Sequence, residues 1–197
     1  MNLSEYQEKA RSTAIYLDIE GSKMIYPALG LVGECGEIAE KVKKIIRDDT
    51  NLDHTLCGNI TPERAEAIAG ELGDCCWYLA NICCDINLAL DMIYKMRGAS
   101  IIQQVRKLVG PRLVLHMNRH AAIVAEALEQ WYYTYDCRIG ETGQFSYISN
   151  HLSHIIACIE EMANRCGFTL EEIYTANIKK LAGRKQRGTL HGEGDVR

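Results

Sequence analysis

The chain has 197 residues, of which 47% are hydrophobic and 24% are charged, a balance typical of a globular domain with a real apolar core. The net charge of −4 provides no general attraction to nucleic acid polymers or to anionic membranes, so we expect neither as a partner. Only three prolines and two phenylalanines occur, and this composition favours helices over a β-sandwich.

The nine cysteines are odd in number, and four of them form the doublets Cys75-Cys76 and Cys83-Cys84. Cysteines within an apolar helical pattern usually act as small buried hydrophobic residues. We therefore expect free thiols and a reducing, cytoplasmic compartment. No basic segment followed by an apolar stretch opens the sequence and no apolar run has transmembrane length, so we expect neither a signal peptide nor a membrane span.

The hydrophobic periodicity predicts an all-α fold without strands. Ser4 and Gln7 form a possible capping box for a first helix that extends to about Ile19. Thr61 and Pro62 begin a long third helix, and Thr169 with Glu172 predicts a capping box for the last one. The helices expected after the first cover about residues 27–47, 62–96, 100–109, 111–135, 145–166 and 170–181.

Polar, glycine-containing segments separate some of these helices. Residues 48–59 and 136–144 are expected to be loops. The tail from Gly183 to Arg197 is rich in glycine and charge and has no apolar period, so we expect it to be mobile or ordered by a ligand.

A shift of 80 residues aligns DINLALDMIY (85–94) with RCGFTLEEIY (165–174), and IAEKV (38–42) resembles VAEAL (124–128). One interpretation is a duplicated helical unit, so that a single chain imitates a dimer. The alternative is that two amphipathic helices look alike because they share one period. In a duplication, Glu34, Glu71 and Asp74 correspond to His120, His151 and His154, and the second copy has lost its acidic residues.

Two acidic pairs are the strongest candidates for chemistry. Glu34 and Glu37 are three residues apart on one predicted helix, and Glu71 and Asp74 are three apart on the next. Residues at this spacing project from one face, so two packed helices would gather four carboxylates. Their mutual repulsion and lost hydration are relieved by a divalent cation, and Mg²⁺ prefers such oxygen ligands. Buried acidic groups can also be purely structural.

Three glycines lie beside these pairs and are costly within a helix, at about 1 kcal/mol each relative to alanine. Their presence suggests close helix contacts or space for a ligand. They are Gly33, Gly36 and Gly73.

At these residues the sequence resembles the MazG-like superfamily of all-α nucleoside triphosphate pyrophosphohydrolases, whose hallmark is E-E-x-x-E followed by E-x-x-D. GECGEIAEKVKK and ELGDCCWYLA carry the two acidic pairs, and LSEYQEKA and NIKKLAGRKQRGTLHGEGDVR resemble the ends of such proteins. Gly33 replaces the first acid of the motif, the gap between the pairs is long, and residues 89–166 have no counterpart in the smallest members.

The resemblance implies hydrolysis of a nucleoside triphosphate to a monophosphate and pyrophosphate. Mg²⁺, which Mn²⁺ can replace, would be held by Glu34, Glu37, Glu71 and Asp74, with a nucleotide as the partner. Lys41 and Lys44 continue the first acidic face and could meet phosphate, or they are solvated lysines. Tyr78 could contact the sugar or base, or it is a packed core tyrosine. A basic stripe could bind phosphate, or its cations are those that the dipole favours at a helix C-terminus; it contains Asn177, Lys180, Arg184 and Arg187.

Three alternatives use the same helices. A di-iron bundle requires Glu-x-x-His motifs, which neither acidic pair has. A zinc site could use histidines at helical spacing on two helices, although such histidines are often structural. A degenerate binding or regulatory module would keep the bundle without turnover. The histidines of the zinc alternative are His116, His120, His151 and His154.

The expected organisation is one all-α domain. Residues 1–98 are expected to form the catalytic unit, residues 99–166 an inserted or degenerate copy, and residues 167–197 the final helix and basic tail. Small members of the superfamily pair their subunits, so we expect a homo-oligomer, an internal pseudo-dimer, or both. The pseudo-dimer predicts one active site per chain, built from residues 30–44, 70–82 and the basic stripe, with no catalytic magnesium at His151 and His154.

Overall fold

The computed structural model describes residues 1–19, 22–48, 60–135 and 142–189. These segments contain helices and no strand, and one isolated bridge joins Ile19 to Ser22. The prediction of an all-α fold is therefore confirmed. The helices are α1 (Leu3–Ser12), α2 (Ile25–Asp48), α3 (Pro62–Asp85), α4 (Leu90–Met96), α5 (Gly98–Arg106), α6 (Gly110–Tyr135), α7 (Thr142–Arg165) and α8 (Leu170–Gln186).

The first helix differs from its prediction at both ends. Its N-cap is Asn2, which forms a capping box with Glu5, so the predicted box of Ser4 and Gln7 is wrong. The helix ends at Ser12 rather than near Ile19, and its C-cap residue Thr13 donates both its amide and its hydroxyl to the carbonyl of Ala10, at 3.1 Å and 2.8 Å.

The predicted helix over residues 62–96 is two helices that meet at an angle of 109°. The break lies at Asn87, whose φ of 56° is in the left-handed region that ends many helices. The amide of Leu88 then donates to the carbonyl of Cys83 at 2.7 Å, which closes the end of α3. Asparagine tolerates this backbone conformation, so a helix terminus forms without glycine.

The same terminus recurs 80 residues later, where Gly167 has a φ of 85° and Phe168 donates to the carbonyl of Ala163 at 2.9 Å. The bounds of α3 shifted by 80 residues are the bounds of α7. The fully buried residues Ile68 and Leu72 likewise recur as Ile148 and Leu152, also fully buried. The structure therefore supports the internal repeat and extends it, with α1–α4 as the first unit and α5–α8 as the second.

This repeat changes the expected division of the chain. The second unit begins near Gly98 and includes α8, which sequence analysis had separated from residues 99–166. The last helix also continues to Gln186 rather than ending near Leu181, so the first residues of the predicted mobile tail are helical. The remainder of that tail, residues 190–197, lies outside the described residues, as do the predicted loop residues 49–59 and 136–141.

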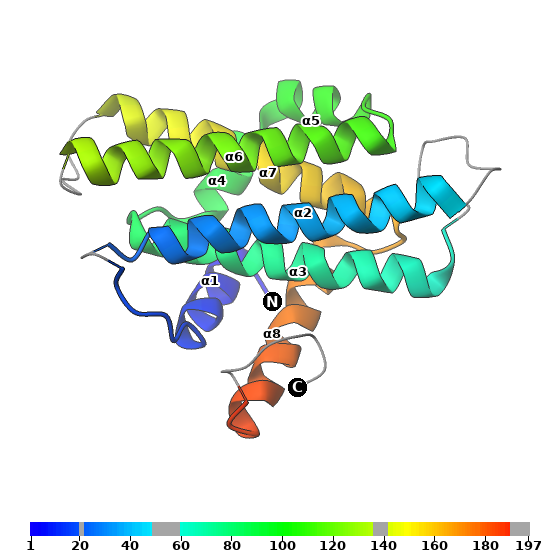
Figure 1. Cartoon of the computed structure of the whole chain (residues 1–197), viewed down its shortest axis with the longest axis horizontal. Coiled ribbons are helices and arrows are strands. Elements are labelled where there is room, and N and C mark those ends of the chain that lie inside the picture. The colour runs from blue at the N-terminus through cyan, green and yellow to red at the C-terminus, as the bar shows by residue number, and fades with distance from the viewer. Residues whose placement is uncertain (20–21, 49–59, 136–141, 190–197) are drawn as a thin grey trace.

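The two units exchange their last helices. The hairpins α2–α3 and α6–α7 stack through α2 and α6, as Figure 1 shows. Helix α8 packs on α3 of the first unit, and α4 packs on α7 of the second. Each hairpin is thus covered by a helix from the other unit, so the two units share one core.

Two further features of the described segments are the state of their cysteines and the apolar character of their helices. The cysteines of the described segments are free, and Cys35, Cys75, Cys76, Cys83 and Cys158 are buried as small apolar side chains, as expected. Within the described residues, no helix by itself has the length and apolar character to cross a membrane, although α3 and α4 together meet that test as a bent pair.

Candidate metal centre

Three carboxylates converge between α2 and α3. Glu34 projects from α2, while Glu71 and Asp74 lie one turn apart on α3. One oxygen from each of the three lies within 4.8 Å of the others, close enough for a single cation to contact all three. The structure therefore brings together three of the four predicted acidic residues.

The fourth acidic residue, Glu37, lies outside this group. Its side chain is exposed one turn further along α2. The predicted cluster of four carboxylates is therefore a group of three, which we call the carboxylate trio (Glu34, Glu71 and Asp74). The i, i+3 spacing gives a shared face, but the last residue of the pair lies where that face meets solvent.

Two lysines and an asparagine contact the trio. Lys41 of α2 forms an ion pair with Glu71, with 2.8 Å between Nζ and Oε1. From α8, Asn177 donates to Oδ1 of Asp74 at 2.7 Å, and Lys180 donates to Oδ2 at 2.5 Å. The exchanged helix therefore completes the site, and both oxygens of Asp74 are held by the second unit.

The electrostatics of the trio are unfavourable to three ionised carboxylates. Burial, followed by the charges of Asp74 and Glu71, raises the pKa of Glu34 to about 8. Burial also raises the pKa of Asp74, although Lys180 acts in the opposite direction. Two lysines thus do not fully offset the repulsion, and a bound divalent cation would relieve it.

The helical glycines serve two purposes. At Gly73, an added Cβ would lie 3.1 Å from Cβ of Asn177, so the absence of a side chain allows α8 to approach α3. At Gly33 and Gly36, an added Cβ would meet no atom within 4 Å, so the surface beside Glu34 is open. Close packing and open space, the two expectations from sequence, both occur around the trio.

A groove of about 410 Å³ runs between α3 and α8 beside Asp74. Sequence analysis missed it, although the small residues at one face of α3 were a signal for it. Lys180 borders both the groove and the trio. The groove is lined by Glu66, Ala69, Gly70, Gly73, Phe168, Glu172, Ile173, Ala176, Asn177 and Lys180.

Tyr78 and Lys44, two predicted substrate residues, have other contacts in the structure. Tyr78 packs its ring over Gly30, close to the ring of Tyr26, and burial raises its pKa. Lys44 is exposed and pairs with Glu40 at 3.3 Å, so its predicted role at the acidic face is not supported.

The basic stripe on α8 divides into two parts. Asn177 and Lys180 reach the trio, and the charge of Arg184 is close enough to oppose in part the rise that burial causes in the pKa of Asp74. Arg187 is the exposed C-cap residue, and its guanidinium lies along its own helix near Gly183. The N-terminal part of the predicted stripe, at Asn177 and Lys180, therefore faces the trio.

A second group of possible ligands lies between α6 and α7. Nε2 of His116 is 3.3 Å from Nδ1 of His154, and Nδ1 of His120 is 2.6 Å from Nδ1 of His151. Burial and the neighbouring imidazoles lower the pKa of His120 to about 3 and that of His154 to about 4. The four histidines of the zinc alternative are thus gathered in one place.

Comparison with known proteins relates the chain to a phage protein. No family model and no solved structure matches the chain. The Gene 37 protein of Mycobacterium phage L5 is 40% identical over 99 residues, a match that covers 47% of this chain and 79% of the phage protein. This identity extends over most of the phage protein, so the chain belongs to the same family as the phage L5 Gene 37 protein.

Proposed function

We propose that the chain is a magnesium-dependent nucleoside triphosphate pyrophosphohydrolase of the MazG-like type. It would convert a ribo- or deoxynucleoside triphosphate and water into the monophosphate and pyrophosphate, and so control the nucleotide pool. The observation that carries this proposal is the carboxylate trio on two packed helices, flanked by Lys41 and Lys180.

The residues present fit a hard divalent cation. All three donors are carboxylate oxygens within 4.8 Å of one another, the ligand type that Mg²⁺ and Mn²⁺ prefer. Glu34, Glu71 and Asp74 would hold the ion, and the exposed side chain of Glu37 would supply a further ligand from the solvent side. When bound, the ion would polarise the phosphate and lower the pKa of the attacking water.

The lysines have a second role in this proposal. Lys41 and Lys180 neutralise Glu71 and Asp74 in the structure described. With a cation on the carboxylates, their ammonium groups become available to substrate phosphates, and Arg184 lies on the same side of α8. One of the glutamates would accept the proton of the attacking water.

The groove between α3 and α8 provides a place for the nucleoside. Its wall combines small residues of α3 with Phe168 and Ile173. Lys180 stands between this groove and Asp74, which would place phosphates at the trio and the base in the groove. The groove therefore takes the place of Tyr78 as the proposed contact to the base, because Tyr78 packs on Gly30.

The repeat supports one site per chain. Helix α8 of the second unit covers the trio of the first, so the chain supplies the covering helix for which small relatives would need a second subunit. The match to the phage protein covers under half of this chain but about four-fifths of that shorter protein, consistent with an added unit here.

Self-association of the whole chain stays a prediction, which light scattering would test.

The decisive experiment is a screen of ribo- and deoxynucleoside triphosphates and diphosphates with Mg²⁺ or Mn²⁺, in which pyrophosphate and monophosphate are measured separately. We expect pyrophosphate release that is lost in Glu71→Gln and Asp74→Asn. Glu63→Gln and Lys44→Gln, at exposed positions of α3 and α2, are matched controls that should retain it. Absence of pyrophosphate release from every nucleotide would refute the proposal and favour a non-catalytic binding module.

A further inference from the structure

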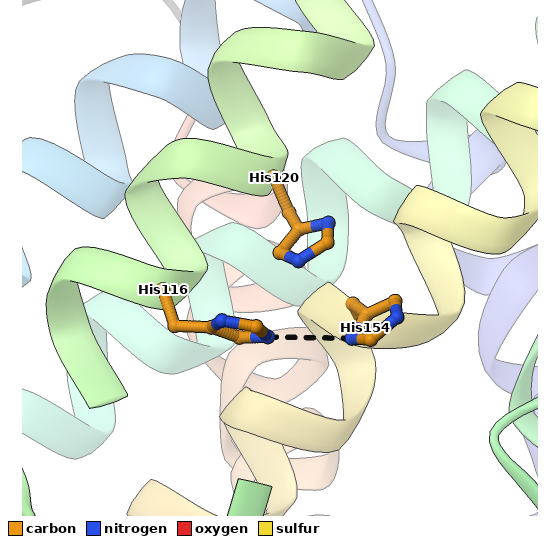
Figure 2. A group of neighbouring side chains, drawn as sticks. All are labelled: His116, His120 and His154. Atoms are coloured by element: carbon orange, nitrogen blue, oxygen red, sulfur yellow. Dashed lines mark hydrogen bonds between the residues drawn. The ribbon is translucent and has the colours of Figure 1, made fainter. Parts of the chain in front are cut away.

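The histidine group between α6 and α7 forms a second, chemically different site. We infer that His116, His120 and His154 bind a divalent transition-metal ion such as Zn²⁺, independently of the carboxylate trio. One nitrogen from each of the three lies within 4.8 Å of the others. Figure 2 shows the three side chains pointing toward one another, with a nitrogen of His120 directed into the space between His116 and His154.

The spacing of the nitrogens fits a zinc site. Zn–N bonds of about 2.0–2.1 Å place two nitrogens of a tetrahedral site about 3.3–3.4 Å apart. Nε2 of His116 and Nδ1 of His154 are 3.3 Å apart, so an ion could replace the proton that these two nitrogens share. His120 is stacked on His154 with 4.2 Å between ring centroids, so a small shift of its ring would bring its nitrogen onto the same ion.

The hydrogen bonds of His120 identify the nitrogen that would bind. Nη2 of Arg119 lies 3.2 Å from Nε2 of His120, and a guanidinium can only donate, so Nε2 carries a lone pair. The proton then resides on Nδ1 and is donated to Nδ1 of His151 at 2.6 Å. A metal ion would take the lone pair from Arg119, an exposed residue that can turn toward solvent.

His151 has the position of an orienting residue. It accepts the N–H of His120 and so fixes the ring that would present Nε2 to the ion, a common arrangement behind metal-bound histidines. Besides burial, the groups that shift the pKa values of the cluster are histidines and Arg119, and no carboxylate is among the causes of these shifts. Nitrogen donors without oxygen donors favour zinc, cobalt, nickel or copper over magnesium.

The place of the cluster in the fold gives the ion a function. A shift of 86 residues takes Glu34 to His120, and a shift of 80 takes Asp74 to His154, so the cluster lies in the second unit where the trio lies in the first. Ligands from α6 and from α7 would join the two helices of one hairpin. The ion would therefore stabilise the second unit, which supplies α8 to the other site.

Cobalt provides the direct test, because tetrahedral Co²⁺ with nitrogen ligands absorbs visible light. Protein freed of any affinity tag and of metal by a chelator would be titrated with Co²⁺ in excess Mg²⁺, followed by zinc displacement and metal analysis. We expect one Co²⁺ per chain, and at least tenfold weaker binding in His116→Gln and in His154→Gln. Asp74→Asn, in the trio, should retain the visible bands, and so should His191→Gln, which removes a histidine that is not one of the proposed ligands.

Arg119→Gln supplies a test that leaves the cluster histidines intact. Removal of the competing donor should leave Co²⁺ binding unchanged or make it several-fold tighter. Circular dichroism would show whether each variant folds. The inference is overturned if the wild-type chain binds no stoichiometric Co²⁺ or Zn²⁺, if folded His116→Gln and His154→Gln variants bind as tightly as wild type, if Asp74→Asn loses the bands, or if Arg119→Gln abolishes binding.

Discussion

Replacement of Glu34 by glutamine should stabilise the metal-free protein at alkaline pH. The pKa of this carboxyl is raised from 4.5 to about 8 by burial and by the charges of Asp74 and Glu71. The unfolded chain therefore releases this proton near pH 4.5, whereas the folded chain retains it until about pH 8. Stability that is present below pH 4.5 is lost as the pH rises to 8.

The size of the effect follows from this difference. A rise of the pKa from 4.5 to about 8 corresponds to roughly 5 kcal/mol for a group shielded from water. Glu34 is half-buried, and solvent screening reduces the expected cost to about 1–2 kcal/mol. Glutamine fills the same space without titrating. Glu34→Gln should therefore match wild type near pH 4.5 and exceed it by about 1–2 kcal/mol, or about 2–8 °C in Tm, at pH 9.

Urea unfolding followed by circular dichroism, with a chelator and a reductant present, would measure both proteins at pH 5 and pH 9. Addition of Mg²⁺ at pH 9 should then stabilise wild type and have little effect on Glu34→Gln. The reasoning is refuted if the variant is less stable than wild type at pH 9, or if their difference is the same at both pH values.

Three further outcomes test other contacts of the site. Lys180→Gln should lower kcat/KM by at least tenfold in a pyrophosphate assay, because it removes the ammonium group that lies beside Asp74. An unchanged value would exclude binding of substrate phosphate by Lys180. Gly30→Ala should cost about 1–3 kcal/mol in urea unfolding, since an added Cβ would lie 2.1 Å from a ring atom of Tyr78; equal stability would contradict this packing. Glu37→Gln should need more Mg²⁺ but regain activity at high concentration, whereas Asp74→Asn should stay inactive; the reverse order would exchange their roles.

Local signals predicted much of the fold. The cap at Thr61 and the box at Thr169 and Glu172 lie where the structure has them, because a hydroxyl that caps a helix acts on its own neighbours. The end of α3 was missed because Asn87 takes a left-handed backbone that most residues avoid. A signal was nevertheless present, since the shift of 80 residues aligns Asn87 with Gly167, which is a recognisable helix terminus.

The candidate site was predictable as far as one helical hairpin supplies it. Helical spacing placed Glu71 and Asp74 on one face, and their convergence with Glu34 followed from packing two such faces. The contact of Lys180 with Asp74 spans 106 residues and depends on α8 crossing to the other unit, which no local pattern specifies. For the same reason, the small residues of α3 indicated close packing or open space but not the groove that α8 forms beside Asp74.

The exchange of α4 and α8 has a consequence for the order in which the protein is made. Helix α8 is the last of the described helices to leave the ribosome, and it carries Asn177 and Lys180. Until then, Asp74 lacks both of these partners and one wall of the groove is absent. A nascent chain can thus build its acidic hairpin early, but it acquires a complete site only when synthesis of the second unit is finished.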